Sequence, residues 1–207
     1  MTTLLFCAAM ALVLGGCGAQ AGAGKGSGEA TETANARFAP QRTDIRGESL
    51  KPFDDPDCKA VALVFFMPDC PIANSYVPEL NRLHGLYGPG SIAIYVVQAD
   101  PQITLEQAAK HQQEYALVPP VVLDPEHEWV KLAGATRTPE AAVFSREGKL
   151  LYRGRIDDRY VAVGKQRPGA TKHDLADALE AIALGRSVPQ ATTEAVGCYI
   201  PELAKEK

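Results

Sequence analysis

The hydrophobic pattern is densest in the uncharged run from Val61 to Phe66, VALVFF. Its residues are β-branched and aromatic, which is typical of a strand covered on both faces in a parallel or mixed sheet. Pro68 ends this run. The apolar positions that follow recur at spacings of three and four: Ile72, Tyr76, Leu80 and Leu83. This spacing predicts a helix, so Cys70 lies in a turn between a strand and a helix.

Strand and helix patterns continue to alternate as far as residue 184. The further predicted strands are Ile92–Val97, Val121–Leu123, Ala141–Phe144 and Lys149–Arg153. The first helix is expected to end near Leu86–Gly90. Three later helices are predicted: Leu105–Tyr115, a short helix within Asp124–Ala133, and His173–Leu184. Thr104 is expected to cap the first of these three. Repeated strand and helix patterns predict an α/β sheet.

The position of Cys70 favours a reactive thiol. At the start of a helix, unpaired backbone N–H groups and the helix dipole stabilise a thiolate over a thiol. The neighbouring carboxylate of Asp69 has the opposite effect. A thiolate at Cys70 could attack a disulfide or a peroxide. We therefore expect its sulfur to be accessible.

Two segments resemble those of thioredoxin-like proteins. The first is the strand followed by a turn in which Cys70 opens a helix, with Pro78 eight positions later. The second is Gly134–Phe144, GATRTPEAAVF, which resembles the loop in which a cis Thr-Pro bond faces the reactive cysteine. The fourth position of the usual C-x-x-C motif is Ala73 here. The chain is most similar to bacterial redoxins related to the alkyl hydroperoxide reductase and thiol-specific antioxidant group.

The resemblance implies an α/β fold of the thioredoxin-like three-layer type, with a mixed central sheet and helices on both faces. Residues 37–190 would form this domain, opened by a hairpin within Arg37–Pro56, and residues 191–207 would form a tail. The implied site consists of the nucleophile Cys70 and of Pro139, with Asp69, Pro71, Thr138 and Arg137 shaping it. The irregular stretch Arg155–Lys172 is expected beside Cys70, either as a substrate surface or as a solvated insertion.

The resolving thiol must come from elsewhere, because Ala73 replaces the usual second cysteine. Cys198 is the candidate, since the twelve residues between Gly185 and Cys198 can cross roughly 20–25 Å at about 3.3 Å each. A structural bridge from Cys198 to Cys58 is the rival. Cys58 and Cys70 flank the first strand, too far apart for the Cα separation of about 7 Å that a disulfide needs. Redoxin relatives combine an Asp-Cys-Pro turn with a late Gly-Cys segment, which favours Cys70 with Cys198.

Three functions are consistent with these residues. The first is thiol-disulfide exchange, with protein or small-molecule thiols and disulfides as partners and with no cofactor. The second is a thiol peroxidase, for which Arg137 would supply positive charge, although Met67 stands where peroxiredoxins place Thr or Ser. The third is a non-enzymatic copper-handling module, for which four histidines are available: His84, His111, His127 and His173. None of them has a recognisable spacing to Cys70, so no metal site is predicted.

The N-terminus resembles a bacterial lipoprotein signal. Residues 1–16 contain the short uncharged run Thr3–Gly16, and Leu14-Gly15-Gly16-Cys17 resembles a lipoprotein cleavage box. Cys17 would then carry the lipid, and residues 17–36, rich in Gly and Ala, would form a flexible tether. This predicts an exported protein anchored to the cell envelope and facing the periplasm or cell exterior. An ordinary secretory signal with an incidental cysteine is the alternative.

The size and charge of the chain limit the classes of protein to which it can belong. The chain has 207 residues, of which 46% are apolar and 22% are charged, and this fits one globular domain with appendages. The net charge is −4 and no basic cluster occurs, so the sequence argues against nucleic-acid binding.

Overall fold

The computed structural model describes residues 42–88 and 90–204. The predicted signal segment 1–16, the tether 17–36 and the lipidation site Cys17 lie outside the described residues. None of the described helices is both long and apolar enough to cross a membrane.

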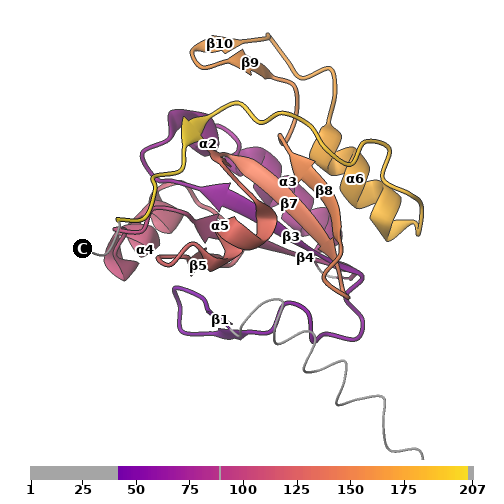
Figure 1. The fold of residues 1–207 in the computed structure, drawn as a ribbon, viewed down its shortest axis with the longest axis horizontal. Coiled ribbons are helices and arrows are strands. Elements are labelled where there is room, and N and C mark those ends of the chain that lie inside the picture. The colour runs from indigo at the N-terminus through magenta and orange to yellow at the C-terminus, as the bar shows by residue number, and fades with distance from the viewer. Residues whose placement is uncertain (1–41, 89, 205–207) are drawn as a thin grey trace, which may run out of the picture.

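A five-stranded mixed sheet in the order β5-β4-β3-β7-β8 forms the centre of the fold (Figure 1). Its strands are β3 (Ala60–Phe66), β4 (Ile92–Gln98), β5 (Val121–Leu123), β7 (Glu140–Ser145) and β8 (Leu150–Gly154). β3 is parallel to β4 and antiparallel to β7, and β8 is antiparallel to β7. All seven residues of β3 are buried, because the strand has neighbours along both edges and its side chains pack in apolar clusters on both faces of the sheet. The predicted mixed sheet is confirmed.

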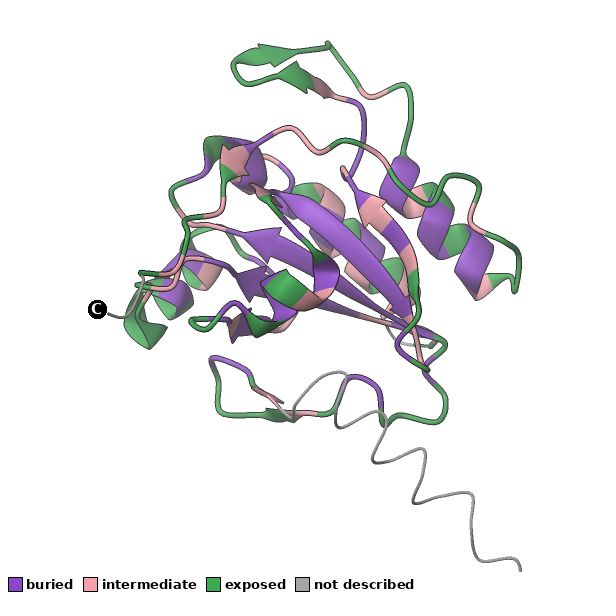
Figure 2. Cartoon of the chain, in the orientation of Figure 1, coloured by how far each residue is buried: buried purple, intermediate pink, exposed green. Residues whose placement is uncertain are grey.

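Helices cover both faces of this sheet, so the predicted three-layer arrangement is also confirmed (Figure 2). The side chains of β3 alternate between two apolar clusters. Ala62 and Val64 pack with α3 (Val77–Tyr87) and α6 (Asp174–Ala183), together with Ala108 of α4 (Leu105–Glu114). Leu63 and Phe65 pack with α5 (Glu128–Ala133) and with Phe53 on the opposite face.

The helix after Cys70 differs from the prediction because it is divided into two. α2 spans Pro71–Asn74, and α3 begins at Val77 after a turn at Ser75 and Tyr76. Pro78 lies in the first turn of α3, where its missing N–H leaves no intrahelical hydrogen bond unmade. In one continuous helix this residue would have had to donate to Asn74. The proline therefore ends the first helix and starts the second.

Two of the later helices, α4 and α5, begin where a side chain accepts hydrogen bonds from backbone N–H groups. α4 follows Thr104, which forms a reciprocal capping box with Gln107, as the predicted cap requires. α5 begins at Glu128, four residues later than the start of the predicted segment. The buried carboxylate of Asp124 accepts hydrogen bonds from the backbone N–H groups at the start of α5, at Glu128, Trp129 and Val130.

Three short strand pairs lie outside the main sheet. They are β1 (Arg42–Thr43) with β2 (Ser49–Leu50), β6 (Arg137–Thr138) with β11 (Cys198–Tyr199), and β9 (Tyr160–Ala162) with β10 (Lys165–Gln166). The first pair is the described part of the predicted opening hairpin. The third shows that the stretch 155–172 contains a projecting hairpin, so the prediction of a fully irregular loop was wrong.

Two leucines of α3 allow the contribution of the core to the free energy of unfolding to be measured. Leu80 is fully buried, whereas Leu86 is 61% exposed on the same helix. Leu80→Ala should lower the free energy of unfolding by about 2–5 kcal/mol through lost burial and a cavity. Leu86→Ala is the matched control and should change it by less than about 0.5 kcal/mol. Urea denaturation measures both, and equal effects would contradict the placement of α3.

Candidate active site

Cys70 and the Thr138-Pro139 bond, the two features of the predicted site, meet in the structure. Cys70 precedes α2 at the end of β3, and its Sγ–H donates to the carbonyl oxygen of Thr138 at 3.1 Å. The Thr138-Pro139 bond is cis, as the sequence predicted. Thr138 and Pro139 are both buried. The two segments that resemble thioredoxin-like proteins therefore form one site.

The C-terminal segment brings Cys198 to the same place. β11 pairs antiparallel with β6, so that Cys198 lies opposite Thr138 and Tyr199 lies opposite Arg137. The next backbone N–H, that of Ile200, donates to the carbonyl oxygen of Thr136 at 3.1 Å. The Cys198 thiol lies within hydrogen-bonding reach of the Cys70 sulfur. Both cysteines are free thiols in the structure.

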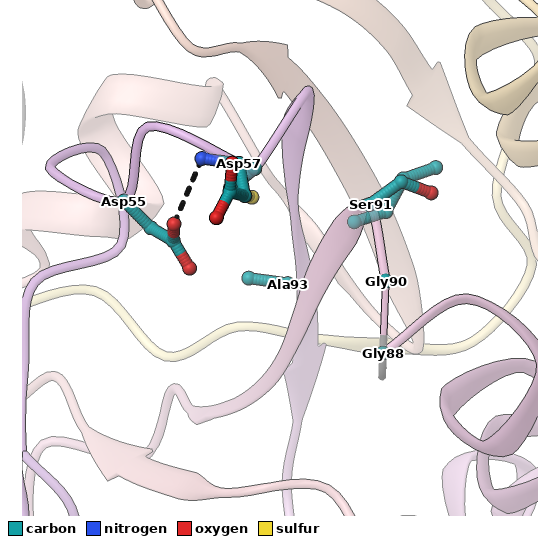
Figure 3. A pocket seen from close by; sticks show the side chains of 8 residues that line it. Asp55, Asp57, Gly88, Gly90, Ser91 and Ala93 are labelled. Atoms are coloured by element: carbon teal, nitrogen blue, oxygen red, sulfur yellow. Dashed lines mark hydrogen bonds between the residues drawn. The ribbon is translucent and has the colours of Figure 1, made fainter.

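Cys58 lies at the other end of β3. Its Sγ–H donates to the carbonyl oxygen of Ala60 at 2.9 Å, and the residue lines a hollow of about 550 Å³ with Asp55 and Asp57 (Figure 3). Because seven strand residues rise by roughly 23 Å, Cys58 is remote from Thr138 and from Cys198 opposite it. The arrangement favours Cys70 over Cys58 as the neighbour of Cys198.

The two neighbouring thiols differ in their proton affinity. Burial raises the pKa of the Cys70 thiol, but hydrogen bonds to its sulfur outweigh burial and lower the pKa overall. The donors are the Cys198 thiol and the backbone N–H groups of Ala73 and Cys198. Burial and the neighbouring Cys70 sulfur raise the pKa of Cys198 to about 11. Cys70 is therefore the sulfur that ionises first.

The prediction that the Cys70 sulfur is accessible was wrong for this structure. Cys70 is 0% exposed. The sequence places the cysteine turn at the end of a strand, but it does not show that the C-terminal segment returns to β6 beside it. In Figure 1 this yellow segment runs from α6 across the sheet toward α2. Access by a large substrate requires the site to open.

The predicted site-shaping residues occupy different positions. Asp69 and Pro71 are exposed beside the cysteine turn. The guanidinium carbon of Arg137 lies 3.5 Å from the centre of the Tyr199 ring, and its Nη1 donates to the carbonyl oxygen of Gly197 at 3.3 Å. Arg137 thus holds the C-terminal segment. Glu140, which the sequence analysis did not single out, accepts backbone hydrogen bonds from Thr136 and Arg137 and orients that loop.

The stretch 155–172 contacts the turn between α2 and α3. The Tyr76 hydroxyl donates to the buried carboxylate of Asp157 at 2.5 Å, and the Tyr160 hydroxyl donates to Ser75 at 3.0 Å. Burial and Asp157 raise the pKa of Tyr76, so its hydroxyl remains a donor. The stretch was predicted to lie beside Cys70, and its hydrogen bonds reach the turn that follows α2, at Ser75 and Tyr76. Its role as a substrate surface stays a prediction.

The histidines do not assemble around Cys70. His111 and His127 are buried. His111 bonds the Asn74 side chain at 2.8 Å, and Asn74 donates to the Pro68 carbonyl oxygen at 2.7 Å, which ties α4 to the cysteine turn. Within residues 42–88 and 90–204, no group of three His, Cys, Asp or Glu side chains is arranged to hold a metal ion.

The hydrogen bond from Cys198 should control the ionisation of Cys70. Cys198→Ala removes this donor, so the pKa of Cys70 should rise, whereas Cys198→Ser keeps a hydroxyl donor and should give a lower pKa than the Ala variant. The measurement is the pH dependence of iodoacetamide alkylation, quantified on the Cys70 peptide by mass spectrometry. A pKa in the Ala variant equal to or below that in the Ser variant would contradict the assignment.

Comparison with solved structures supports the fold. An uncharacterised conserved protein from Geobacillus kaustophilus is 25% identical, with a TM-score of 0.68 over 80% of this chain and 89% of that one. A hypothetical protein from Sinorhizobium meliloti 1021 is 24% identical, with a TM-score of 0.64 over 80% and 91% of the two chains. A putative thiol:disulfide interchange protein DsbE from Chlorobium tepidum shares the fold at 20% identity, with a TM-score of 0.50 over 70% and 90%.

None of the curated proteins matches this sequence. The family model described as AhpC/TSA matches residues 35–153, a segment that contains Cys70 and Pro139 and ends before Cys198. This segment covers more than half of the chain. The protein therefore belongs to the AhpC/TSA family, which confirms the redoxin resemblance predicted from its sequence and supports an oxidoreductase activity.

Proposed function

We propose that the protein is a thiol-disulfide oxidoreductase in which Cys70 is the nucleophile and Cys198 is the resolving thiol. The observation that carries this proposal is the pairing of Cys198 with Thr138, which sets the Cys198 thiol against the Cys70 sulfur. A second thiol next to the nucleophile replaces the function of the missing C-x-x-C cysteine, for which the chain has Ala73.

The reaction proceeds by two exchanges. The Cys70 thiolate attacks one sulfur of a substrate disulfide, a Cys70–substrate disulfide forms, and the other substrate sulfur leaves as a thiolate. Deprotonated Cys198 then attacks the Cys70 sulfur, forms the Cys70–Cys198 disulfide and releases the second substrate thiolate. The substrate disulfide gains two electrons and the protein dithiol loses them. An external thiol reverses the change in the protein.

The unequal proton affinities suit this order of events. The lowered pKa of Cys70 supplies the attacking thiolate. The charge on Cys70 is one cause of the raised pKa of Cys198. Once Cys70 is in a mixed disulfide this charge is gone, so Cys198 loses its proton more readily. The second attack therefore becomes favourable after the first is complete.

A thiol peroxidase is the second candidate, and one feature of the site favours it. The Thr138 hydroxyl is buried without a hydrogen-bond partner among the described residues, next to Cys70. It could donate to a peroxide oxygen. The Cys70 thiolate would attack that peroxide, become a sulfenic acid and release an alcohol or water, and Cys198 would then condense with it and release water.

Cysteine variants distinguish the proposed roles. Cys70→Ser should abolish insulin reduction, while Cys198→Ser should accumulate a mixed disulfide at Cys70 and turn over slowly. Cys58→Ser is the control and should retain activity, because Cys58 lies at the other end of β3. Non-reducing peptide mapping of the oxidised protein should show Cys70 joined to Cys198. A Cys58–Cys198 peptide would refute the assignment, and peroxide-driven sulfenic acid without insulin reduction would favour the peroxidase.

The proposal extends to location, where the support is the N-terminal sequence. The short uncharged run and the Leu14-Gly15-Gly16-Cys17 box resemble a lipoprotein signal, so the enzyme would be exported and tethered to the cell envelope through a lipid on Cys17. A site that uses paired thiols is compatible with an oxidising compartment.

Labelling with radioactive palmitate in a bacterial host tests this location. Cys17→Ala should abolish incorporation and leave unprocessed precursor, because the lipid is attached to that thiol. Cys7→Ala is the matched control within the signal segment and should incorporate label like the wild type. A mature, unlabelled protein released from the envelope would instead show an ordinary secretory signal.

A further inference from the structure

The edge of β6 is occupied by a peptide that belongs to the chain itself. Residues 197–200, which we term the docked segment, make a short antiparallel pairing across residues 136–138. The backbone N–H of Ile200 donates to the Thr136 carbonyl oxygen, and the side chain of Arg137 donates to the Gly197 carbonyl oxygen. Main-chain bonding of this kind binds an extended peptide without fixing its side chains, and specificity then comes from side-chain contacts.

The contact at Gly197 selects strongly for glycine. A Cβ at this position would overlap the carbonyl oxygen of Thr138 and lie 2.7 Å from its carbonyl carbon. The neighbours are backbone atoms of Thr138 and Pro139, which cannot rotate away as a side chain can. The residue before the docked cysteine must therefore lack a side chain.

The next two positions also have defined surroundings. The Tyr199 ring stacks on the guanidinium of Arg137 although the residue is 71% exposed, so the contact is with Arg137 rather than with the core. Beyond it, Ile200 borders a mostly apolar hollow of about 460 Å³ that is shared with Val130 and Ala135 of the α5 side. The edge thus favours glycine, cysteine, an aromatic residue and an apolar residue in sequence.

The docked segment can leave without disturbing the rest of the tail. Its upstream anchor is on β8, where Arg153 donates to Ala191 at 2.9 Å and Thr193 donates to Arg153 at 3.0 Å. Residues 194–196, between this anchor and the docked segment, make no hydrogen bond to the described part of the chain. Detachment of the docked segment therefore breaks the hydrogen bonds of residues 197–200 while the hydrogen bonds of the β8 anchor remain.

We propose that the edge formed by residues 136–138 is a peptide-binding site that selects substrates with the sequence glycine-cysteine-aromatic, and that the docked segment is a built-in competitor for it. This proposal rests on the proposed role of Cys70 as the nucleophile. The substrate cysteine takes the position of Cys198, opposite Thr138 and against Cys70. The substrate class is an extended or locally unfolded polypeptide, because both its main chain and its cysteine must reach the edge.

The test uses two full-length proteins on a Cys58→Ser background. One carries Cys198→Ser, which removes the competing thiol but leaves the segment docked, and the other carries Gly197→Ala and Cys198→Ser together. The probes are synthetic peptides AVGCYIPE, AVACYIPE and AVGCSIPE, each with its cysteine in a disulfide with thionitrobenzoate. Attack by the Cys70 thiolate forms the Cys70–peptide disulfide, breaks the probe disulfide and releases coloured thionitrobenzoate.

In the protein with Gly197→Ala, the added methyl group clashes with Thr138, so the docked segment should leave the edge formed by residues 136–138. The glycine peptide should then react about tenfold or more faster than the alanine peptide, as expected from the cost of inserting a methyl group against rigid neighbours. The serine peptide should react a few-fold more slowly than the tyrosine peptide, because the cation–π contact is lost. The glycine peptide should also react faster with this protein than with Cys198→Ser alone.

The controls separate the two proposals. Equal rates for all three peptides, with normal reaction of the small disulfide dithionitrobenzoate at Cys70, would overturn the peptide-binding site and leave the nucleophile in place. No reaction of Cys70 with dithionitrobenzoate in either protein would overturn the proposed function itself. Mass spectrometry of the Cys70 peptide assigns the reaction in each case, and Arg137→Ala should abolish the tyrosine preference while keeping the glycine preference.

Discussion

The backbone pairing of β11 with β6 is the interaction on which the site depends. It joins residues about 60 positions apart and places one cysteine opposite the Thr138-Pro139 turn. Three features allow this pairing: Glu140 orients the loop, Gly197 permits close approach of the two backbones, and the Arg137 side chain donates a hydrogen bond to the Gly197 carbonyl oxygen. Cys198 is positioned by the main chain, so its own side chain is free to react.

The electrostatic consequence is a pair of thiols with unequal acidity. A buried sulfur normally holds its proton, since burial disfavours the charged form. At Cys70 this is outweighed by the backbone N–H of Ala73 in α2 and by donors from Cys198 itself. The same contact raises the pKa of Cys198. The neighbour that activates the nucleophile is therefore also the group that would later resolve it.

Burial of Cys70 has two opposing consequences for the site, protection of the sulfur and loss of access to it. A covered thiolate is protected from adventitious oxidation, but it must be uncovered to meet a macromolecular substrate. The fold meets both by covering the cysteine partly with a short terminal segment rather than with a layer of the core. The sheet and its helices can remain packed while residues 197–200 detach, because the β8 anchor of the tail is separate from the β6 pairing.

Much of the fold was predictable from the sequence, because the sequence signals for its strands, helices and turns are local. The run Val61–Phe66, the turn at Cys70 and the Thr138-Pro139 loop carry their structure in neighbouring residues. The α/β sheet follows from the order of strands and helices, and the three layers follow from the resemblance to thioredoxin-like proteins. The division of the first helix was missed, although Pro78 was the signal for it. The burial of Cys70 had no local signal at all.

By itself the sequence determined the α/β class and the cysteine at the start of a helix, because periodicity and turn chemistry act over a few residues. The family followed from the resemblance of two short segments to thioredoxin-like proteins. The sequence left open whether Cys198 accompanies Cys70 or Cys58, since twelve residues of tail can reach more than one place. Only the tertiary structure decided that point, because the choice depends on hydrogen bonds between strands distant in sequence and on the absence of a side chain at Gly197.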